Sequence, residues 1–388
     1  MNEEITYVMP GKLGGVFNFV RNLVAHRQSS HFEVATIRTE NAADSDALCH
    51  DAVPSDRDVT FRYSLPPENL HVVLRRLARM LSARAGVVVA NDWIELAATA
   101  RYDTGRAVVA VTHGDYDYYY TLALRHQDTI DAHVTFSERM FQRLRELLPG
   151  RTDSIFLLPY GVDLPREARK PLPAGAPLRL LYVGRFTREK GVFDLPAIDE
   201  RLRNRRVAVS WTMVGSGPDE SAVKAAWPNP AVRWTGIQPL ENVLELYRSH
   251  DVLVLASRHE GLPVSLLEAG AAGVVPVISN LPSGIPDVVT PGVTGYRPEP
   301  GDIDGFVSAI QQLAGSRAEL EAMSAAIRQK VATRYDAAIC TAEYEKLFAE
   351  WRVWKRPRPA HVPFAYGSRL DKPWIPNPVV KAIRSVLK

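Results

Sequence analysis

The chain has only two cysteines among its 388 residues, and it contains no run of about 18 apolar residues of the kind that could cross a membrane as a helix. Cys49 and Cys340 lack the close spacing of metal ligands and are expected to lie in different domains, which fits a reducing cytoplasm. The opening residues MNEEITYVMPG lack the charged-then-apolar layout of a signal peptide. We therefore expect a cytoplasmic globular protein.

Charge is unevenly distributed along the chain. The formal net charge is +3, but residues 352–388 carry nine Lys and Arg against the single Asp371. This leaves 38 basic and 43 acidic residues, or −5, in the remainder. A basic tail on an acidic body suggests contact with anionic lipid or with the protein's own acidic surface.

The length and the 46% hydrophobic content are sufficient for two cores. Short apolar runs alternate with helical patterns, which indicates parallel sheets built from βαβ units. Residues 170–177 have the Pro, Ala and Gly composition of a linker. We therefore predict a first domain at 1–170, a second domain at 171–351 and a basic Pro-rich tail at 352–388. We also expect one helical region from Ser316 to about Trp351. The expected strands are 5–9, 32–37, 59–63, 87–90, 107–112, 133–136, 155–158, 179–183, 207–214, 232–237 and 251–256.

Two clusters of polar residues follow strands in the first half. Asn91-Asp92-Trp93 comes after VVVA, and His113-Gly114-Asp115 comes after VVAVT. Ligands of parallel sheets bind at the carboxyl ends of strands, so both clusters are candidate site residues. The alternatives are a structural role for His113 and a helix N-cap role for Asp92.

The stretch from Arg258 to Val277 carries the strongest signal. We expect a short, mostly buried helix from near Pro263 to about Gly273, with Glu268 in its middle. Unpartnered N–H groups at the helix start, those of Gly261, Leu262 and Val264, would face an anion.

Two carboxylates flank this helix start. Glu260 would face the same place, and Glu268 could accept hydrogen bonds from two vicinal hydroxyls. The alternative is that Glu268 is a buried structural carboxylate paired with an arginine. The pattern suits a nucleotide-sugar, with phosphate at the amides and hydroxyls at the carboxylates.

This pattern, with LPVSLLEA after Glu260 and the later PDVVTPGVTGY, resembles the retaining glycosyltransferases of family four. The resemblance implies an α/β GT-B architecture, with two Rossmann-like parallel-sheet domains facing a central cleft. It also implies that the second domain binds the donor and the first domain binds the acceptor. GRFTREKG at 184–191 is similar to the family's diphosphate-binding loop, so Arg185 and Lys190 are implied to stabilise the departing phosphate.

The family's site residues can be carried over position by position. The implied catalytic residues are His113, Arg185, Lys190 and Glu260, with His113 contacting the donor sugar. The implied donor-binding residues are Gly14, Gly15, Gly184, Gly215, Gly217, Ile237, Gly261, Leu262, Pro263, Val264 and Glu268. Asp92, Asp115 and Tyr116 are candidates for the acceptor side. The family often has paired glycines and a Glu where this chain has Ser283-Gly284 and Asp287.

The expected activity is retaining, metal-independent transfer of a sugar from a nucleotide-diphosphate donor to a glycan, glycolipid or other envelope-type acceptor, with no cofactor and no nucleic-acid partner. Asp115-Tyr116-Asp117 spells a DxD, which binds a metal in other glycosyltransferases, but an acceptor-lining or packing role is favoured here. The rival functions are a 2-epimerase or hydrolase of the same fold, and a non-catalytic nucleotide-sugar-binding scaffold.

An amphipathic helix over Leu70–Arg84 is interpreted either as a basic surface for an anionic membrane or as an ordinary helix packed on the sheet. Together with the basic tail, it predicts a cytoplasmic protein that is peripheral at the inner face of the membrane. The tail either returns to the first domain or touches that membrane.

Overall fold

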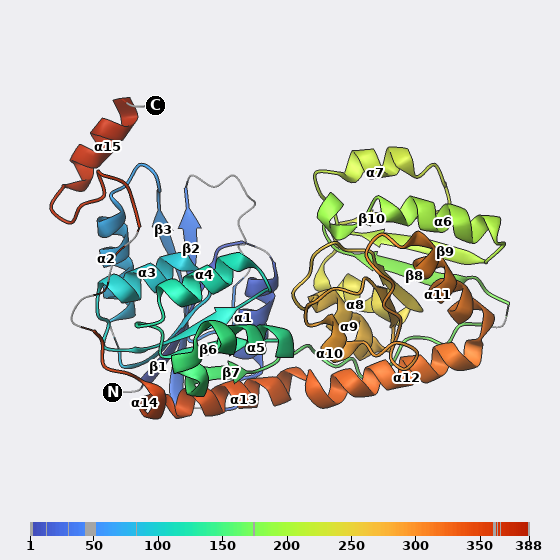
Figure 1. Cartoon of the computed structure of the whole chain (residues 1–388), viewed down its shortest axis with the longest axis horizontal. Helices are drawn as coiled ribbons and strands as arrows, with labels where there is room; N and C mark the ends of the chain where they lie inside the picture. The colour runs from blue at the N-terminus through green and yellow to red at the C-terminus, as the bar shows by residue number, and fades with distance from the viewer. Residues whose placement is uncertain are drawn as a thin grey trace. The chain divides into compact units, whose positions relative to one another are not determined.

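The computed structural model describes residues 3–12, 14–29, 31–42, 52–82, 84–173, 175–359, 362, 364 and 366–386. Cys49 lies outside these residues. The chain divides into two compact units, which Figure 1 shows in cartoon form. Unit 1 consists of Met1–Gly161 and Ala338–Lys388, and unit 2 consists of Val162–Ala337.

Unit 1 is built on a parallel sheet, which has seven strands in the described part of the chain and the order β3-β2-β1-β4-β5-β6-β7. The strand order reverses between β1 and β4, as in doubly wound nucleotide-binding folds, and such a switch point opens a crevice at the carboxyl ends of the strands. The central strands are continuous apolar runs because helices cover both faces of the sheet. The strands are β1 (Glu3–Pro10), β2 (Phe32–Asn41), β3 (Arg57–Tyr63), β4 (Gly86–Ala90), β5 (Ala107–Thr112), β6 (Ala132–Thr135) and β7 (Ile155–Leu157).

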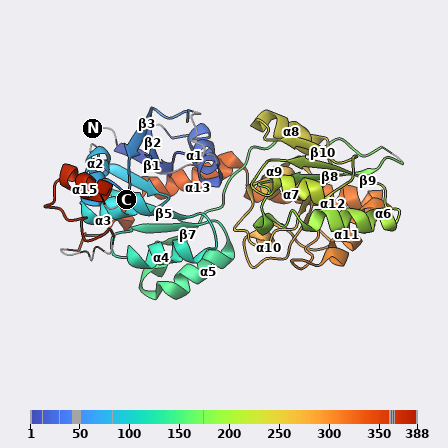
Figure 2. The same ribbon diagram turned by 90° about the horizontal axis from the view of Figure 1, so that it is seen from above.

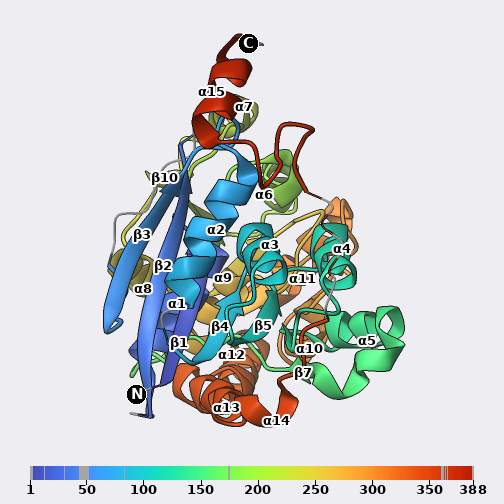
Figure 3. The same ribbon diagram turned by 90° about the vertical axis from the view of Figure 1, so that its left-hand side faces the viewer.

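Two helices of unit 1 pack together over one face of this sheet, as Figure 3 shows for α2 and α3. Most of the apolar side chains of α2 are buried against the sheet and α3, and Met80 packs there partly buried. The apolar face of this helix is therefore not available to a membrane, and the packed-helix interpretation of this segment holds. The helices are α1 (Gly15–Ala25), α2 (Leu70–Leu81), α3 (Trp93–Arg101), α4 (Asp117–Arg125), α5 (Glu138–Leu147), η1 (Pro149–Ser154), α13 (Ala337–Ala349), α14 (Trp351–Trp354) and α15 (Asn377–Val386).

Unit 2 repeats the same topology on a smaller sheet, with the described strands in the order β10-β9-β8-β11-β12. Its helices pack in pairs, α6 beside α11 and α8 beside α9 (Figure 2). The strands are β8 (Leu178–Val183), β9 (Val209–Val214), β10 (Arg233–Gly236), β11 (Val252–Leu255) and β12 (Val275–Ile278). The helices are η2 (Arg188–Lys190), α6 (Asp194–Asn204), α7 (Glu220–Ala226), α8 (Leu240–Arg248), α9 (Val264–Ala272), α10 (Ile285–Val288), α11 (Ile303–Gly315) and α12 (Arg317–Arg334).

The first boundary between the units lies earlier than the expected position near residue 170, because the segment after residue 161 packs on unit 2. Arg169 is buried there, and its guanidinium lies 2.7 Å from the Asp251 carboxylate. The N–H of Lys170 donates to the Arg248 carbonyl at 2.7 Å. The Pro- and Ala-rich stretch after residue 170 is therefore a loop of unit 2 that leads into β8.

The second boundary also differs from the expected one at 351. Instead of one helical region, α12 ends at Arg334 and α13 begins at Ala337. The break occurs because the chain pairs there with Val162, whose N–H donates to the Tyr335 carbonyl at 2.8 Å and whose carbonyl accepts from Ala337 at 3.0 Å. The helix α13 consequently belongs to unit 1, and there Tyr344 packs edge-on against Phe19.

The described part of the tail packs on unit 1 at the start of α2. The Asn69 side chain donates to the carbonyls of Lys372 and Ile375 at 3.0 Å and 2.7 Å. The N–H of Leu70 donates to the Asp371 carboxylate at 2.8 Å. The tail was expected either to return to the first domain or to touch a membrane, and its described part contacts the first domain.

Candidate functional site

The loop after β8 is fixed in place by a glycine. Gly191 has a φ of 67°, and a Cβ there would lie 1.8 Å from the Ala256 carbonyl oxygen. Only glycine permits this approach. The N–H of Arg258 also donates to the Glu189 carbonyl at 2.8 Å. The residues of η2 are therefore held against the segment that follows β11.

This clamp brings Lys190 and Glu260 together. The Lys190 Nζ lies 2.8 Å from Glu260 Oε2, and Ser257 donates to Glu260 Oε1 at 2.7 Å. The Glu260 side chain is 9% exposed and that of Lys190 is 21% exposed. Two of the three predicted catalytic residues of unit 2, Lys190 and Glu260, are therefore in direct contact, although 70 positions separate them in the sequence. Ser257 was not expected from the sequence.

Arg185 lies on the same loop and is exposed. Its carbonyl accepts a hydrogen bond from the hydroxyl of the buried Tyr182 at 2.7 Å. Burial raises the pKa of Tyr182 above its usual value, the Glu260 charge raises it further, and the Arg185 charge lowers it. The charges of Arg185 and Glu260 therefore both act on the Tyr182 hydroxyl, so the exposed Arg185 side chain lies on the same side of the loop as the Lys190–Glu260 pair. Tyr182 was not among the predicted residues.

The predicted glycines at the ends of β8 and β9 allow two loops to interlock. A Cβ at Gly215 would lie 2.0 Å from the Gly184 carbonyl oxygen, and one at Gly217 would lie 2.3 Å from the Phe186 carbonyl oxygen. The N–H of Phe186 also donates to the Ser216 carbonyl at 2.9 Å. These glycines therefore hold the Arg185 loop in position, whatever further contact they make with a ligand.

The helix expected after Glu260 is present as α9, and it ends at Gly273, where φ is 83°. Pro263 is its N-cap, and its carbonyl accepts from Leu266 at 3.1 Å. The N–H of Val264 precedes that of Leu266, which is the donor of this first helical bond, as expected for the exposed end of a helix dipole. The carbonyl of Gly261 accepts from Gly284 at 2.8 Å, which ties the helix start to the Ser283-Gly284 segment.

Glu268 is half-buried rather than enclosed in the middle of the helix. The Tyr247 hydroxyl on α8 donates to its Oε2 at 3.1 Å. Burial, and then the Glu268 charge, raise the pKa of Tyr247 well above its usual value. The Tyr247 hydroxyl therefore helps to orient this carboxylate. Ile237, which follows β10, is 75% exposed.

In unit 1 the ends of β4 and β5 bring Asn91 and His113 together. The Asn91 side chain donates from Nδ2 to the Val8 carbonyl at 2.6 Å, so its Oδ1 faces His113 Nε2 at 2.6 Å. Since an amide oxygen only accepts, Nε2 of His113 carries the proton and Nδ1 is the acceptor. Burial among aromatic rings lowers the pKa of His113 to about 3, so the ring is neutral at neutral pH. The sequence had suggested His113, and it had included Asn91 in a polar cluster of candidate residues without giving it a role of its own.

Asp92 caps helix α3, which is the alternative role weighed from the sequence. Its carboxylate accepts from the Trp93 N–H at 2.7 Å, and a capping box joins it to Glu95. The Tyr118 hydroxyl also donates to Asp92. Burial and the Asp92 charge raise the pKa of the fully buried Glu95 well above its usual value. The Asp-x-x-Glu spacing of residues 92–95 would have predicted this cap.

Asp115 is buried in a network of its own. It lies 2.5 Å from the Arg139 guanidinium and 3.0 Å from that of Arg143, and the Tyr120 hydroxyl donates to it at 2.6 Å. Burial works to raise the pKa of Asp115, but these hydrogen bonds and charges outweigh it and lower the pKa. The carboxylate is therefore already satisfied by protein donors. Tyr116, the next residue, is 37% exposed at the start of α4.

Gly14 and Gly15 begin α1, and a Cβ on either would meet no atom within 4 Å. Packing within unit 1 therefore does not require glycine at these two positions. A close approach to a neighbouring strand or loop explains Gly191, but it does not explain these two glycines.

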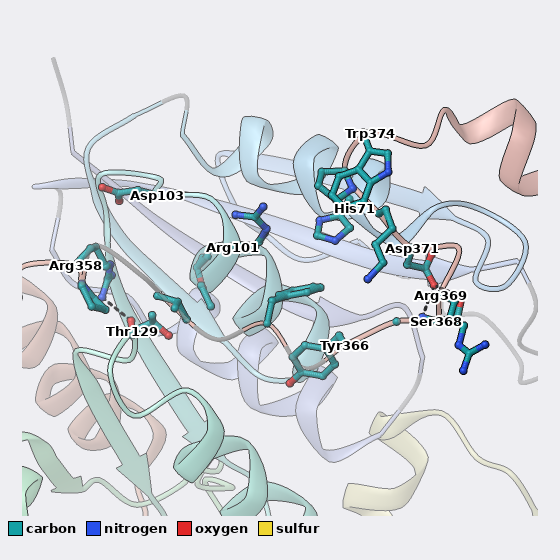
Figure 4. Close-up of a pocket in the computed structure, with 18 residues that line it drawn as sticks. His71, Arg101, Asp103, Thr129, Arg358, Tyr366, Ser368, Arg369, Asp371 and Trp374 are labelled. Atoms are coloured by element: carbon teal, nitrogen blue, oxygen red, sulfur yellow. Dashed lines mark hydrogen bonds between the residues drawn. The ribbon is translucent and has the colours of Figure 1, made fainter.

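A cavity of about 780 Å³ lies in unit 1, between the end of α3 and the C-terminal tail. Figure 4 shows His71, Arg101, Tyr366 and Trp374 around it. It contains none of the predicted site residues. Within the described ranges, no group of three or more His, Cys, Asp or Glu could hold a metal ion. No described helix is both long and apolar enough to span a bilayer.

Comparison with known proteins places this geometry in a family. Residues 165–330 match the family model described as Glycosyl transferases group 1. Glycogen synthase of Mycobacterium tuberculosis is 29% identical over 309 residues, which is 74% of this chain and 74% of that protein. The amylovoran biosynthesis glycosyltransferase AmsK of Erwinia amylovora is 30% identical over 173 residues, which is 42% of each chain.

Solved structures share the fold across nearly the whole chain. Sucrose-phosphate synthase from Thermosynechococcus elongatus superposes with a TM-score of 0.73 at 19% identity, covering 91% of this chain and 100% of that one. HepE of Anabaena in complex with UDP-glucose superposes with a TM-score of 0.72 at 14% identity, covering 89% and 99%.

The two switch-point sheets, the matching family model and the solved structures thus show a glycosyltransferase with the GT-B fold. Residues 165–330 form a group 1 glycosyltransferase domain of the family-four type. The resemblance stated from the sequence is confirmed.

Proposed function

We propose that the protein is a retaining, metal-independent glycosyltransferase that moves a sugar from a nucleoside diphosphate to a glycan, glycolipid or other envelope-type acceptor. The donor class is supported by HepE, which is described in complex with UDP-glucose. The acceptor class is supported by AmsK, which is named for amylovoran biosynthesis.

The observation that carries the proposal is the ion pair of Lys190 and Glu260 beside the start of α9. A diphosphate is a stronger partner for an ammonium group than one carboxylate, because it presents several charged oxygens. Once such a ligand binds, Lys190 would turn to it and Glu260 would be released to accept from the sugar hydroxyls. Arg185, exposed on the same loop, would add a second cation.

The proposed chemistry is a substitution at the anomeric carbon on the face that the leaving group occupies. The acceptor oxygen forms the new bond, the bond to the diphosphate oxygen breaks, and the acceptor's proton passes to that oxygen. Lys190, Arg185 and the amides at the start of α9 stabilise the negative charge that develops on the phosphate. Glu260 orients the sugar and stabilises the positive charge on it, and it forms no covalent bond.

We assign donor binding to unit 2 and acceptor binding to unit 1. Gly14, Gly15 and His113 keep the donor contacts that the family resemblance implies for them, and these contacts stay predictions. The open space at Gly15 supports a ligand role, because neither packing nor a positive φ requires glycine there, whereas the φ of 158° at Gly14 is itself a reason for glycine. We further propose that the enzyme works in the cytoplasm at the inner face of the membrane.

The test begins with a thermal-shift screen of the whole protein against nucleoside diphosphates and their sugars. The true donor should raise the melting temperature by mass action, by the equivalent of about 2.7 kcal/mol at a hundredfold excess over its dissociation constant. Lys190→Ala should abolish most of the shift, whereas a metal chelator should leave it unchanged.

Product analysis with the identified donor then separates the candidates. A new glycoside with the anomeric configuration of the donor supports the proposal. An inverted anomer would refute retention, and a chelator-sensitive rate would refute metal independence. Free sugar or a 2-epimer as the only product would identify the rival enzymes of the same fold. Binding without any product would identify a scaffold.

A further inference from the structure

The last helix of the chain exposes a row of apolar side chains. Val379, Ile383 and Val386 of α15 are 46%, 39% and 84% exposed. With 3.6 residues per turn, these positions lie within an arc of roughly 60° on the helix. We call these three residues the α15 stripe. Trp374, in the turn before the helix, is 75% exposed.

The helix is held firmly to unit 1 by its other side. Val380 is fully buried, and Arg384 donates to the Glu68 carbonyl at 2.6 Å and lies 2.6 Å from the Asp371 carboxylate. The Asn377 side chain accepts from the Asn69 N–H at 2.7 Å. Figures 1 and 3 show α15 standing out from unit 1 beyond the N-terminal end of α2. The α15 stripe is therefore presented away from unit 1 by a fixed helix rather than by a loose chain end.

The charge around the stripe points to an anionic partner. Residues 366–386 contain four basic side chains and one acidic side chain. Arg384 pairs with Asp371, and Lys381 lies 3.7 Å from the Glu68 carboxylate. Arg369 and Lys372 are exposed in the segment before α15 and supply the excess positive charge.

The size of the apolar surface argues against a second protein. A helix of ten residues is about 15 Å long and about 10 Å wide, so it offers roughly 150 Å². A stable protein interface needs about 800 Å² from each partner. Two copies of this surface would also bring the same positive charges together. A lipid bilayer has neither restriction, since it accepts a short apolar row flanked by basic residues.

We propose that the α15 stripe, with Trp374, inserts into the interfacial layer of an anionic lipid bilayer. This inference deepens the peripheral membrane location given under the proposed function by naming the surface responsible. It takes the place of the membrane alternative weighed for the Leu70–Arg84 helix, whose apolar face is largely buried. For a lipid-linked acceptor, the contact would bring unit 1 to the layer in which the acceptor resides.

The proposal is tested by flotation of the full chain with vesicles of phosphatidylcholine alone and with about one third phosphatidylglycerol. The wild-type protein should bind the anionic vesicles, and higher salt should weaken the binding. Ile383→Glu should lower the partition coefficient about tenfold or more. The variant loses an isoleucine side chain that would be buried in the bilayer, and it gains a negative charge that anionic lipids repel. Val353→Glu is the matched control, because Val353 is 85% exposed on α14 of the same tail.

Equal flotation with neutral and anionic vesicles would overturn the role of charge. Equal effects of Ile383→Glu and Val353→Glu would overturn the role of the stripe. A change in oligomeric state on Ile383→Glu, measured by light scattering without lipid, would identify a second copy as the partner instead. Donor-induced thermal shifts should be the same in both variants and in the wild type. A protein that floats but binds no donor would refute the proposed function and leave this inference standing.

Discussion

Removing the ammonium group of Lys190 should lower the turnover number by about 10²–10³, or about 2.7–4 kcal/mol, the effect of deleting one donor to a developing oxyanion. The structure also offers a second cause of lost activity. Because Nζ lies 2.8 Å from Glu260 Oε2, Lys190→Ala leaves that carboxylate with the Ser257 hydroxyl as a neutral donor but without its cation. A distorted Glu260 could then slow the reaction without any direct role for Lys190.

The two causes are separated by their effects on stability. Glu260 is 9% exposed, so orphaning its charge should cost about 1–3 kcal/mol of unfolding free energy. Adding Glu260→Gln to Lys190→Ala removes the unpaired charge and should restore most of that stability. The turnover number should nevertheless stay low, since the diphosphate still lacks its cation. Turnover is measured with the donor from the thermal-shift screen, and stability is measured by urea unfolding.

The control is Lys224→Ala, which breaks another ion pair of unit 2 at 2.7 Å from Glu220. This pair is exposed, so its loss should change neither stability nor turnover measurably. Turnover within a few-fold of wild type in Lys190→Ala would remove this residue from the mechanism. Recovery of turnover in the double variant would show that Lys190 acts only as the partner of Glu260.

Gly191→Ala should destabilise the protein by at least about 1–3 kcal/mol, because its left-handed backbone and a carbonyl 1.8 Å from the new Cβ both oppose the substitution. Gly175→Ala, which also has a positive φ but open space around it, should cost less. The neutral form of His113 contributes stability that is complete above pH 6.5 and is lost as the pH falls toward about 3, so His113→Gln should make urea midpoints less acid-sensitive in that window. Glu268→Gln should raise the KM for the donor about tenfold with little change in kcat, whereas the exposed Glu241→Gln should change neither.

Each of these expectations has a clear opposite. Equal unfolding free energies for the two glycine variants would show that the loop after β8 can move away from Ala256. An unchanged acid profile for His113→Gln would show that its ring is not held neutral. A fall in kcat without a change in KM for Glu268→Gln would place this carboxylate in the transition state rather than in donor binding.

The sheets could be predicted because buried parallel strands appear in the sequence as short apolar runs, as in β4 and β5. The strand β12 was missed, since Val275–Ile278 directly follows the equally apolar α9, with only Gly273 to mark the turn. The unit boundaries were wrong for a related reason. Linker-like composition near residue 170 says nothing about Arg169, whose burial against Asp251 depends on residues 82 positions away.

The site was predictable where short motifs carry it. The GRFTREKG motif contains Lys190, and the stretch from Arg258 to Val277 contains Glu260. Each motif therefore identified one member of the ion pair. The orienting residues were not predictable, because Tyr247 and Asn91 act through contacts between separate elements. Asp92 is different, since the spacing of residues 92–95 already indicates a helix cap.

The division of the chain gives its two units an unusual order of completion during synthesis. Unit 2 is one continuous segment, whereas unit 1 lacks its last part until residues 338–388 emerge. Those residues bring Tyr344 to within 5.5 Å of Phe19 and Phe348 to within 6.1 Å of Tyr7, measured between ring centroids. The N-terminal half therefore leaves the ribosome first but can close its core only last. Until then its aromatic side chains are uncovered, and nascent chains that end before α13 should be the ones that chaperones retain.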